Sequence, residues 1–243
     1  MTVPVDLAVP SRVLAIGAHP DDIEFGCGAT LAKWAAGGTD VHLLILTDGS
    51  KGTWNVDDDL DTLVATRIIE ARAAAAMLAR GTVHFGGFVD GELESDRAGR
   101  ELVCRVVREV RPEIVLGHDP WQRYRLHPDH RHAGWLTIDG IVAARDPHFF
   151  AGVGGPHHRP GTLLLFEADE PNHVEPVDGW TDVKANALLC HRSQWRSTMN
   201  IDPGLGVAEL GAALEAFRST IEHTASHTDH AGLSERFRLI TDL

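Results

Sequence analysis

Two short stretches rich in histidine and aspartate lie far apart in this 243-residue sequence. They are Ala18-His19-Pro20-Asp21-Asp22 and His127-Pro128-Asp129-His130. Imidazole nitrogens and carboxylate oxygens are ligands of zinc, and catalytic zinc sites take three of them and keep a fourth place for water. His19 and Asp22 can point to one side of a turn, and His127 or His130 can complete the set. Iron(II) and other divalent metals accept the same ligand types.

Hydrolysis at such a metal also needs groups that move protons. A bound metal acidifies water and polarises a carbonyl, but a base must still take the water proton and an acid must protonate the leaving group. Because Asp21 and Asp22 are adjacent, one can bind the metal while the other acts as the base. The remaining histidine of the second stretch can stabilise an oxyanion. Asp129 can orient one of the imidazoles.

The rest of the sequence indicates which elements carry these stretches. Apolar runs typical of strands buried on both faces alternate with helix-like segments, and this favours a mostly parallel sheet with helices on both faces. We expect a single α/β domain over residues 1–243. Strands are expected at 13–18, 41–46, 83–88, 114–117, 163–168 and 173–177, and helices at 29–36, 60–78, 97–110, from within 127–130 to about 144, 183–195 and 207–223.

This order of elements has a consequence for the two stretches. Open parallel sheets bind ligands at the carboxyl ends of their strands, where the strand order reverses. The first and fourth strands commonly flank that reversal. The first stretch follows the first expected strand, and His118 and then the second stretch follow the fourth. We therefore expect the two stretches to meet in the folded chain.

Charge and cysteine content exclude several classes of function. The formal net charge of −13 disfavours binding to nucleic acid or an anionic membrane, because both need a positive field. No apolar run reaches the roughly 20 residues that cross a bilayer, and the N-terminus does not have the pattern of a signal peptide. Cys27, Cys104 and Cys190 are too few and too widely spaced for a disulfide framework. A cytoplasmic protein is the expectation.

With both stretches in place, the sequence resembles the LmbE/PIG-L family of zinc-dependent N-deacetylases and amidases. The resemblance extends to Thr47-Asp48-Gly49, to Arg67 and Glu70, to Asp90-Gly91 and to several residues of 184–194. It implies a Rossmann-like fold with one zinc per chain. It also implies hydrolysis of an N-acyl group, often the acetyl of an N-acetylglucosamine unit, so the expected partner is a small N-acylated amino sugar or its conjugate.

The resemblance also implies roles for the residues of the two stretches. His19, Asp22 and His130 match the zinc ligands, and Asp21 matches the general base. His127 would stabilise the oxyanion or protonate the leaving amine.

Other residues are expected to support the site or contact the substrate. The resemblance implies that Asp129 supports His127, and that Arg67 and Asp90 match sugar-binding positions. Some relatives have a tyrosine just before the second stretch, and Tyr124 is near that place without matching it securely. Arg125 can hold a phosphate or carboxylate of the substrate by bidentate hydrogen bonds.

Further histidines lie outside both stretches. They are expected to be solvated rather than to form a second metal site, because loop histidines are mostly exposed. They are His157, His158, His223, His227 and His230.

Three alternatives remain beside the deacetylase interpretation. The first is an amidase that removes a larger acyl group from a thiol–sugar conjugate. The second is a dinucleotide-binding oxidoreductase, which the absence of G-x-G-x-x-G after the first expected strand disfavours. The third is a metal-binding protein without activity, which Asp21 disfavours because a pure binder needs no base. The sequence is also compatible with a homo-oligomer.

Overall fold

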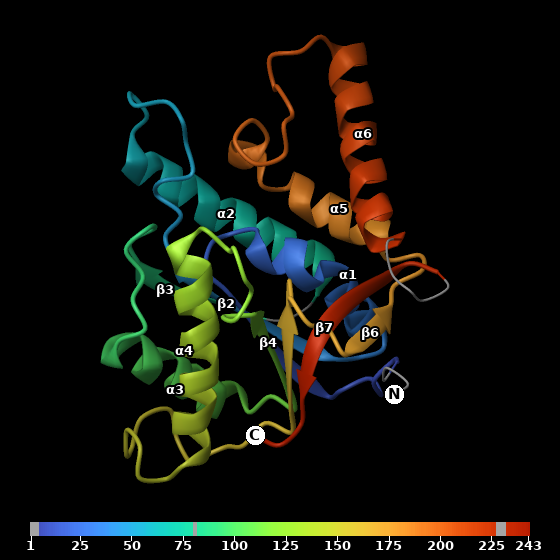
Figure 1. Ribbon diagram of the computed structural model, residues 1–243. Helices are drawn as coiled ribbons and strands as arrows, with labels where there is room; N and C mark the ends of the chain where they lie inside the picture. The colour runs from blue at the N-terminus through green and yellow to red at the C-terminus, as the bar shows by residue number, and fades with distance from the viewer. Residues whose placement is uncertain (1–4, 80–81, 227–231) are drawn as a thin grey trace.

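The computed structural model describes residues 5–79, 82–226 and 232–243. Its central feature is a seven-stranded sheet with the order β3-β2-β1-β4-β5-β7-β6 and helices on both faces (Figure 1). The strands are β1 Arg12–Gly17, β2 Asp40–Thr47, β3 Val83–Phe88, β4 Ile114–His118, β5 Thr162–Phe166, β6 His173–Pro176 and β7 Ser234–Ile240. The strands from β3 to β5 along the sheet run parallel, and only β7 runs against its neighbours. The expected α/β class with a mostly parallel sheet is confirmed.

The helices form two layers around this sheet. Helices α3 and α4 pack together on one face, whereas α1 and α2 cover the other, α5 packs on α1 and α2, and α6 packs on α5 (Figure 1). The helices are α1 Asp22–Ala36, α2 Leu60–Leu78, α3 Arg97–Val110, α4 Pro128–Arg145, α5 Thr181–Leu189 and α6 Val207–Ser226, with a short 3-10 helix at Arg192–Gln194.

Strand β1 shows why the expected strands are continuous apolar runs. Leu14 and Ile16 pack into the core under α3 and α4, while Val13 and Ala15 pack into the core under α1 and α2. All four side chains are fully buried. Because both faces of the strand are covered, neither set of alternating positions can be polar.

The sheet order places the carboxyl ends of β1 and β4 side by side. Strand β1 pairs with β2 on one side and with β4 on the other, with Val13 opposite Ile114. The chain therefore reverses its direction of travel across the sheet between these two strands. The expectation that the loops after the first and fourth strands are neighbours is confirmed.

Three elements differ from those expected. Helix α1 starts at Asp22 rather than at residue 29. Its first part is rich in glycine, which weakens the helical pattern in the sequence, and the helix is interrupted at Cys27 (φ −152°, ψ 18°). The expected helix 183–195 ends at Leu189, and its last residues form the short 3-10 helix. Strand β7 was missed, because its sequence Ser-Glu-Arg-Phe-Arg-Leu-Ile carries charged side chains through much of its length.

The histidines that were expected to be solvated differ in their exposure, and the three cysteines form no disulfide within the described residues. His157 and His223 are exposed, as expected, whereas His158 is half-buried and its Nε2 donates to the carbonyl of Pro112 at 2.7 Å. His227 and His230 lie outside the described residues. The cysteines carry free thiols; Cys27 and Cys104 are buried, and Cys190 is half-buried.

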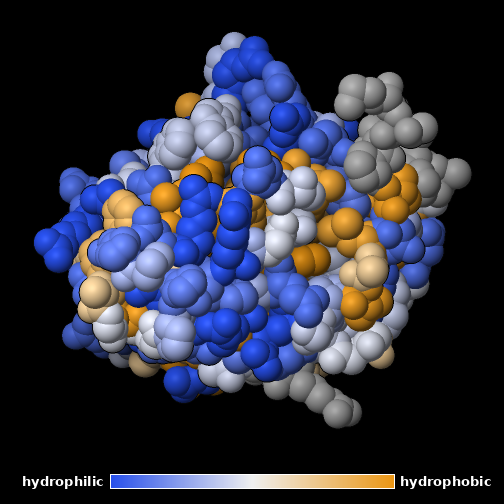
Figure 2. All heavy atoms as spheres, turned by 90° about the horizontal axis from the view of Figure 1, so that it is seen from below, coloured by the Kyte–Doolittle hydropathy of each residue, from blue (hydrophilic) through white to orange (hydrophobic). Residues whose placement is uncertain are grey.

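The face seen from below the view of Figure 1 is covered mainly by hydrophilic residues, with patches of apolar residues between them (Figure 2). Within the described ranges, no helix is both long enough and apolar enough to span a membrane.

Gly134 on α4 lets that helix approach the loop after β4 closely. A Cβ atom on Gly134 would lie 2.7 Å from the carbonyl oxygen of His118 and 2.8 Å from the nitrogen of Pro120. Both atoms belong to the backbone, so they cannot move aside cheaply. We expect Gly134→Ala to lower the free energy of unfolding by about 1–3 kcal/mol, measured by denaturant titration.

Gly211→Ala is the matched control for this substitution. Gly211 lies within α6, and a Cβ atom there meets nothing within 4 Å. The same change should therefore stabilise the chain by up to about 1 kcal/mol, because alanine is the better helix former. Equal effects at the two positions would contradict a close contact at Gly134.

Candidate metal centre and active site

The turn after β1 brings His19 and Asp22 to the start of α1. The backbone N–H of His19 donates to Asp22 Oδ2 at 2.7 Å, and the N–H of Asp22 donates to the carbonyl of His19 at 3.3 Å. Between them, Asp21 has a φ of 110°, in the left-handed region that aspartate seldom adopts. Such a conformation costs of order 1–3 kcal/mol and is typical of functional sites.

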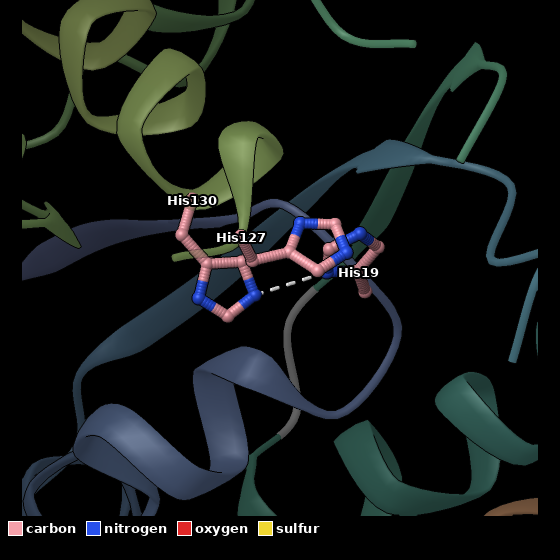
Figure 3. A group of neighbouring side chains, drawn as sticks. All are labelled: His19, His127 and His130. Carbon is pink, nitrogen blue, oxygen red and sulfur yellow. Dashed lines mark hydrogen bonds between the residues drawn. The ribbon is translucent and has the colours of Figure 1, made fainter. Parts of the chain in front are cut away.

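The second stretch forms the first turn of α4. Pro128 occupies the first turn, where its missing N–H costs nothing. His127 caps the helix, because its Nδ1 accepts from the backbone N–H of Asp129 at 3.3 Å. His127 and His130 thus project from the start of α4 toward His19, and the three imidazoles converge (Figure 3).

Three of these side chains have the spacing of metal ligands. His19 Nδ1 lies 3.2 Å from Asp22 Oδ2 and 3.2 Å from His130 Nε2, and His130 Nε2 lies 3.3 Å from Asp22 Oδ1. Ligand atoms at about 2.0–2.1 Å from a tetrahedral zinc are separated by about 3.3 Å, so the two imidazole nitrogens and the Asp22 carboxylate fit such an ion. Burial alone would raise the pKa of Asp22, but the neighbouring imidazoles hold it well below its usual value.

The described residues offer further sets of three that share members with this one. His19, His127 and His130 form one, and Asp22, His118 and His130 form another. A third set joins His19 to two carboxylates. The structure therefore contains a candidate His/Asp metal site in which several sets of three possible ligands share residues.

The second nitrogen of His19 faces two carboxylates. His19 Nε2 lies 3.2 Å from Asp129 Oδ2 and 3.2 Å from Asp90 Oδ1. Asp129 is fully buried, and its carboxylate accepts from the backbone N–H groups of Gly91 and Leu93 at 2.7 and 3.3 Å. A proton on Nε2 is therefore well bound, which leaves Nδ1 free for a metal. Asp129 contacts His127 through its backbone N–H, and this contact is the expected support. The carboxylate of Asp129 instead contacts His19 and orients its imidazole.

Arg67 and Asp90, the two expected sugar-binding residues, are both buried. The Arg67 guanidinium is 3 % exposed and donates to the carbonyls of Gly49 and Pro20 at 2.9 and 2.5 Å. It also lies 3.4 Å from Asp21 Oδ2. Burial raises the pKa of Asp21 to about 6, with the positive charge of Arg67 opposing the rise. Arg67 thus holds the predicted base in place, and its contact with a sugar stays a prediction, as does that of Asp90.

Two further groups belong to the site: His118, which the sequence placed there without a role, and Glu167, which the sequence analysis missed. His118, at the end of β4, lies 3.3 Å through Nε2 from Asp22 Oδ2 and 3.3 Å through Nδ1 from Glu167 Oε2. Its position at a strand end was a usable signal, but Glu167 follows β5 and has no sequence signature. The backbone of Glu167 is left-handed, with a φ of 55°. Together the two residues form a chain of contacts that ends at the carboxylate of the candidate ligand Asp22.

Arg125 and Tyr124 lie on the loop between β4 and α4. The Arg125 guanidinium binds Glu167 Oε2 at 2.9 Å and donates from Nε to His130 Nδ1 at 2.8 Å. Tyr124 is 88 % exposed. In this structure Arg125 is engaged within the protein, and the expected substrate contacts of both residues stay predictions.

Comparison with known proteins decides the family. The model of the PIG-L family, described as GlcNAc-PI de-N-acetylase, matches residues 14–140, which include both histidine-aspartate stretches. The chain belongs to the PIG-L family. The sequence-based assignment to this family of amide hydrolases is confirmed.

Individual members of the PIG-L family are similar over most of the chain. Diacetylchitobiose deacetylase of Thermococcus kodakarensis is 36 % identical over 76 % of this chain and 70 % of its own length. The 1D-myo-inositol 2-acetamido-2-deoxy-alpha-D-glucopyranoside deacetylase of Rhodococcus jostii is 32 % identical over 96 % and 87 %. Among solved structures, N,N'-diacetylchitobiose deacetylase from Pyrococcus horikoshii superposes with a TM-score of 0.81 at 27 % identity, covering 96 % of this chain and 84 % of that one.

The contact of Arg125 with His130 competes with a metal on His130. Nδ1 must lack a proton to accept from Arg125, whereas an imidazole that binds a metal through Nε2 carries its proton on Nδ1. Removing the guanidinium also removes a positive charge beside a cation site. We expect Arg125→Ala to raise the affinity for Zn²⁺ about three- to tenfold, measured by competition with a chelator.

Arg123→Ala is the control, because Arg123 lies on the same loop but pairs with Asp169 at 3.2 Å. It should leave the zinc affinity within about twofold, as an exposed ion pair contributes little. A tenfold loss of affinity in Arg125→Ala would show instead that the arginine supports the metal ligand.

Proposed function

We propose that this chain is a zinc-dependent N-deacetylase that releases acetate from an N-acetylated amino sugar or its conjugate. The observation that carries the proposal is the spacing of 3.2–3.3 Å between His19 Nδ1, the Asp22 carboxylate and His130 Nε2, next to the carboxylate of Asp21. Its support from outside the chain is the similarity to deacetylases named for diacetylchitobiose and for an inositol-linked acetamido sugar.

His19, Asp22 and His130 are the proposed zinc ligands. Each of these three residues lies 3.2–3.3 Å from the other two, and the other nitrogen of His19 is held by Asp129. Two imidazoles and one carboxylate leave a coordination place open, as a catalytic zinc site requires. Zinc in this position would polarise the amide carbonyl and make water more acidic. Other divalent metals would fit the same ligands.

Asp21 is the proposed general base. Its neighbour Asp22 is used as a ligand, and its own carboxylate has Arg67 as a loose partner at 3.4 Å. The left-handed backbone at Asp21 separates the two adjacent carboxylates. Asp21 takes the proton of the attacking water, and the same proton can then be passed to the nitrogen of the leaving amine. The C–N bond breaks, and acetate and a free amine are the products.

His127 is the proposed donor to the developing oxyanion. Because its Nδ1 accepts from the backbone N–H of Asp129, its proton is on Nε2. The imidazole is exposed and its ring lies 4.7 Å from that of His19, centroid to centroid. A donor fixed beside the metal before the reaction begins stabilises negative charge on the carbonyl oxygen without reorganisation.

Asp21→Asn tests the proposed base without removing a proposed zinc ligand. The amide keeps the shape of the side chain but cannot take a proton, so we expect kcat for amine release from methyl N-acetyl-β-D-glucosaminide or N,N'-diacetylchitobiose to fall by about 10²–10⁴-fold. The zinc content should stay near one per chain, measured by elemental analysis. A near-normal kcat in this variant would mean that another group is the base.

His130→Ala tests the third ligand. Loss of one of three protein ligands should weaken zinc binding by at least about 100-fold, measured by chelator competition, and activity should fall with the metal content. His42→Ala is the matched control, since His42 lies on β2 against His84, away from the cluster. Unchanged zinc affinity in His130→Ala would transfer the ligand role to His118 or His127.

A further inference from the structure

A cavity of about 770 Å³ lies among α1, α5, α6 and β7. Its lining comes from segments far apart in the sequence, including Phe25 on α1, Met199 after the 3-10 helix and Phe217 on α6. The volume falls within the roughly 300–1,000 Å³ of small-molecule sites. None of the proposed zinc ligands lines it. The cavity is therefore a separate space beside the metal centre.

Two residues connect this cavity to the metal centre. Glu167 lines the cavity, and its carboxylate lies 3.3 Å from His118 Nδ1, while His118 Nε2 lies 3.3 Å from the proposed zinc ligand Asp22. Phe25, which also lines it, donates its backbone N–H to the carbonyl of Asp21 at 3.0 Å. The cavity wall therefore lies one side chain, His118, away from the proposed ligand Asp22.

The α6 wall of the cavity is mainly apolar. It is made by residues spaced three or four apart, which share one face of the helix. The hydroxyls of Thr220 and Thr224 donate to the α6 carbonyls of Ala216 and Thr220 at 3.0 and 2.9 Å, which leaves the methyl groups as the less polar surface. The residues of this wall are Ala213, Ala216, Phe217, Thr220, Ile221, Thr224 and Ala225.

Three of the four charged residues that line the cavity are paired within the protein, and the fourth, Arg236, is exposed. Lys184 Nζ lies 2.7 Å from Glu235 Oε1 and donates to the carbonyl of Phe25 at 2.7 Å. Glu235 also accepts from the backbone N–H groups of Ala29 and Thr30. Glu167 is held in the same way by Arg125 and His118. With three of the four charges paired in this way, the aromatic and aliphatic lining favours an apolar ligand.

We propose that this cavity binds an apolar group that the substrate carries outside its N-acetylated sugar, such as an alkyl or aryl aglycone. The inference rests on the proposed function and narrows it to amphipathic sugar conjugates. Each methylene group moved from water into an apolar wall is worth about fourfold in affinity. Burial of two or more methylenes therefore gives a preference of at least about tenfold over a sugar that lacks them.

The test compares two substrates that differ only in the aglycone. Methyl and hexyl N-acetyl-β-D-glucosaminide are assayed for amine release with the zinc-loaded protein, and the hexyl-to-methyl ratio of kcat/KM is expected to be at least about ten. Ala216→Trp places an indole in the cavity from an exposed position on α6 and should reduce this ratio to about two or less. A wild-type ratio near one, or a ratio that Ala216→Trp leaves unchanged, overturns the proposal.

Ala212→Trp is the matched control, because Ala212 is exposed on the same helix and does not line the cavity. It should leave the ratio unchanged. A change of oligomeric mass in Ala216→Trp with an unchanged ratio would assign the cavity to a contact between two copies of the chain and would also overturn the proposal.

A titration without hydrolysis separates this proposal from the proposed function. Hexyl β-D-glucopyranoside has no amide, and its binding is measured by calorimetry with the wild type and both variants. Binding that only Ala216→Trp abolishes supports an apolar subsite even where neither acetylated glycoside is hydrolysed, so that the deacetylase activity alone fails. Absence of binding to the wild type counts against the cavity.

Discussion

The imidazole of His19 joins the two halves of the site, and the arrangement around it depends on its two nitrogens having different partners. Nδ1 faces Asp22 and His130, whereas Nε2 faces the carboxylates of Asp129 and Asp90. A proton held on Nε2 by buried carboxylates makes Nδ1 a permanent lone-pair donor toward the proposed metal. The contact also ties the turn after β1 to the start of α4.

This arrangement is possible because β1 and β4 are neighbours in the sheet. Their adjacent carboxyl ends bring residues about 110 positions apart in the sequence into contact. Gly134 allows α4 to pack directly on the loop after β4. This packing positions the start of α4, which carries His127 and His130. Behind Asp22, the line through His118 to Glu167 continues to the edge of the large cavity. The proposed metal centre and the proposed apolar subsite are thus connected through one chain of side chains.

The sequence was sufficient for the parts of this account that depend on local pattern. Apolar runs of β1, β2 and β4 located the strands, and strand order alone brought the two histidine-aspartate stretches together. The resemblance to a family then singled out His130 from His127 and assigned the base to Asp21. These roles fit the distances, although the distances by themselves leave overlapping ligand sets.

Contacts between distant side chains were beyond such reasoning. Arg67 was expected to contact a sugar, and the sequence did not indicate that it is buried against the carbonyls of two loops and beside Asp21. Glu167 has no motif, and it belongs to the site only because β5 lies next to β4. Strand β7 was missed because its charged residues hide the alternation, and the cavity that it helps to form was missed with it.

The most direct test of the central claim is a crystal structure of the zinc-loaded protein, with the metal located by anomalous scattering at the zinc edge. The account predicts one strong site per chain, coordinated by His19 Nδ1, the Asp22 carboxylate and His130 Nε2, with Asp129 still on His19 Nε2. Zinc bound by His118 in place of His19, or by the carboxylates of Asp90 and Asp129, would contradict it.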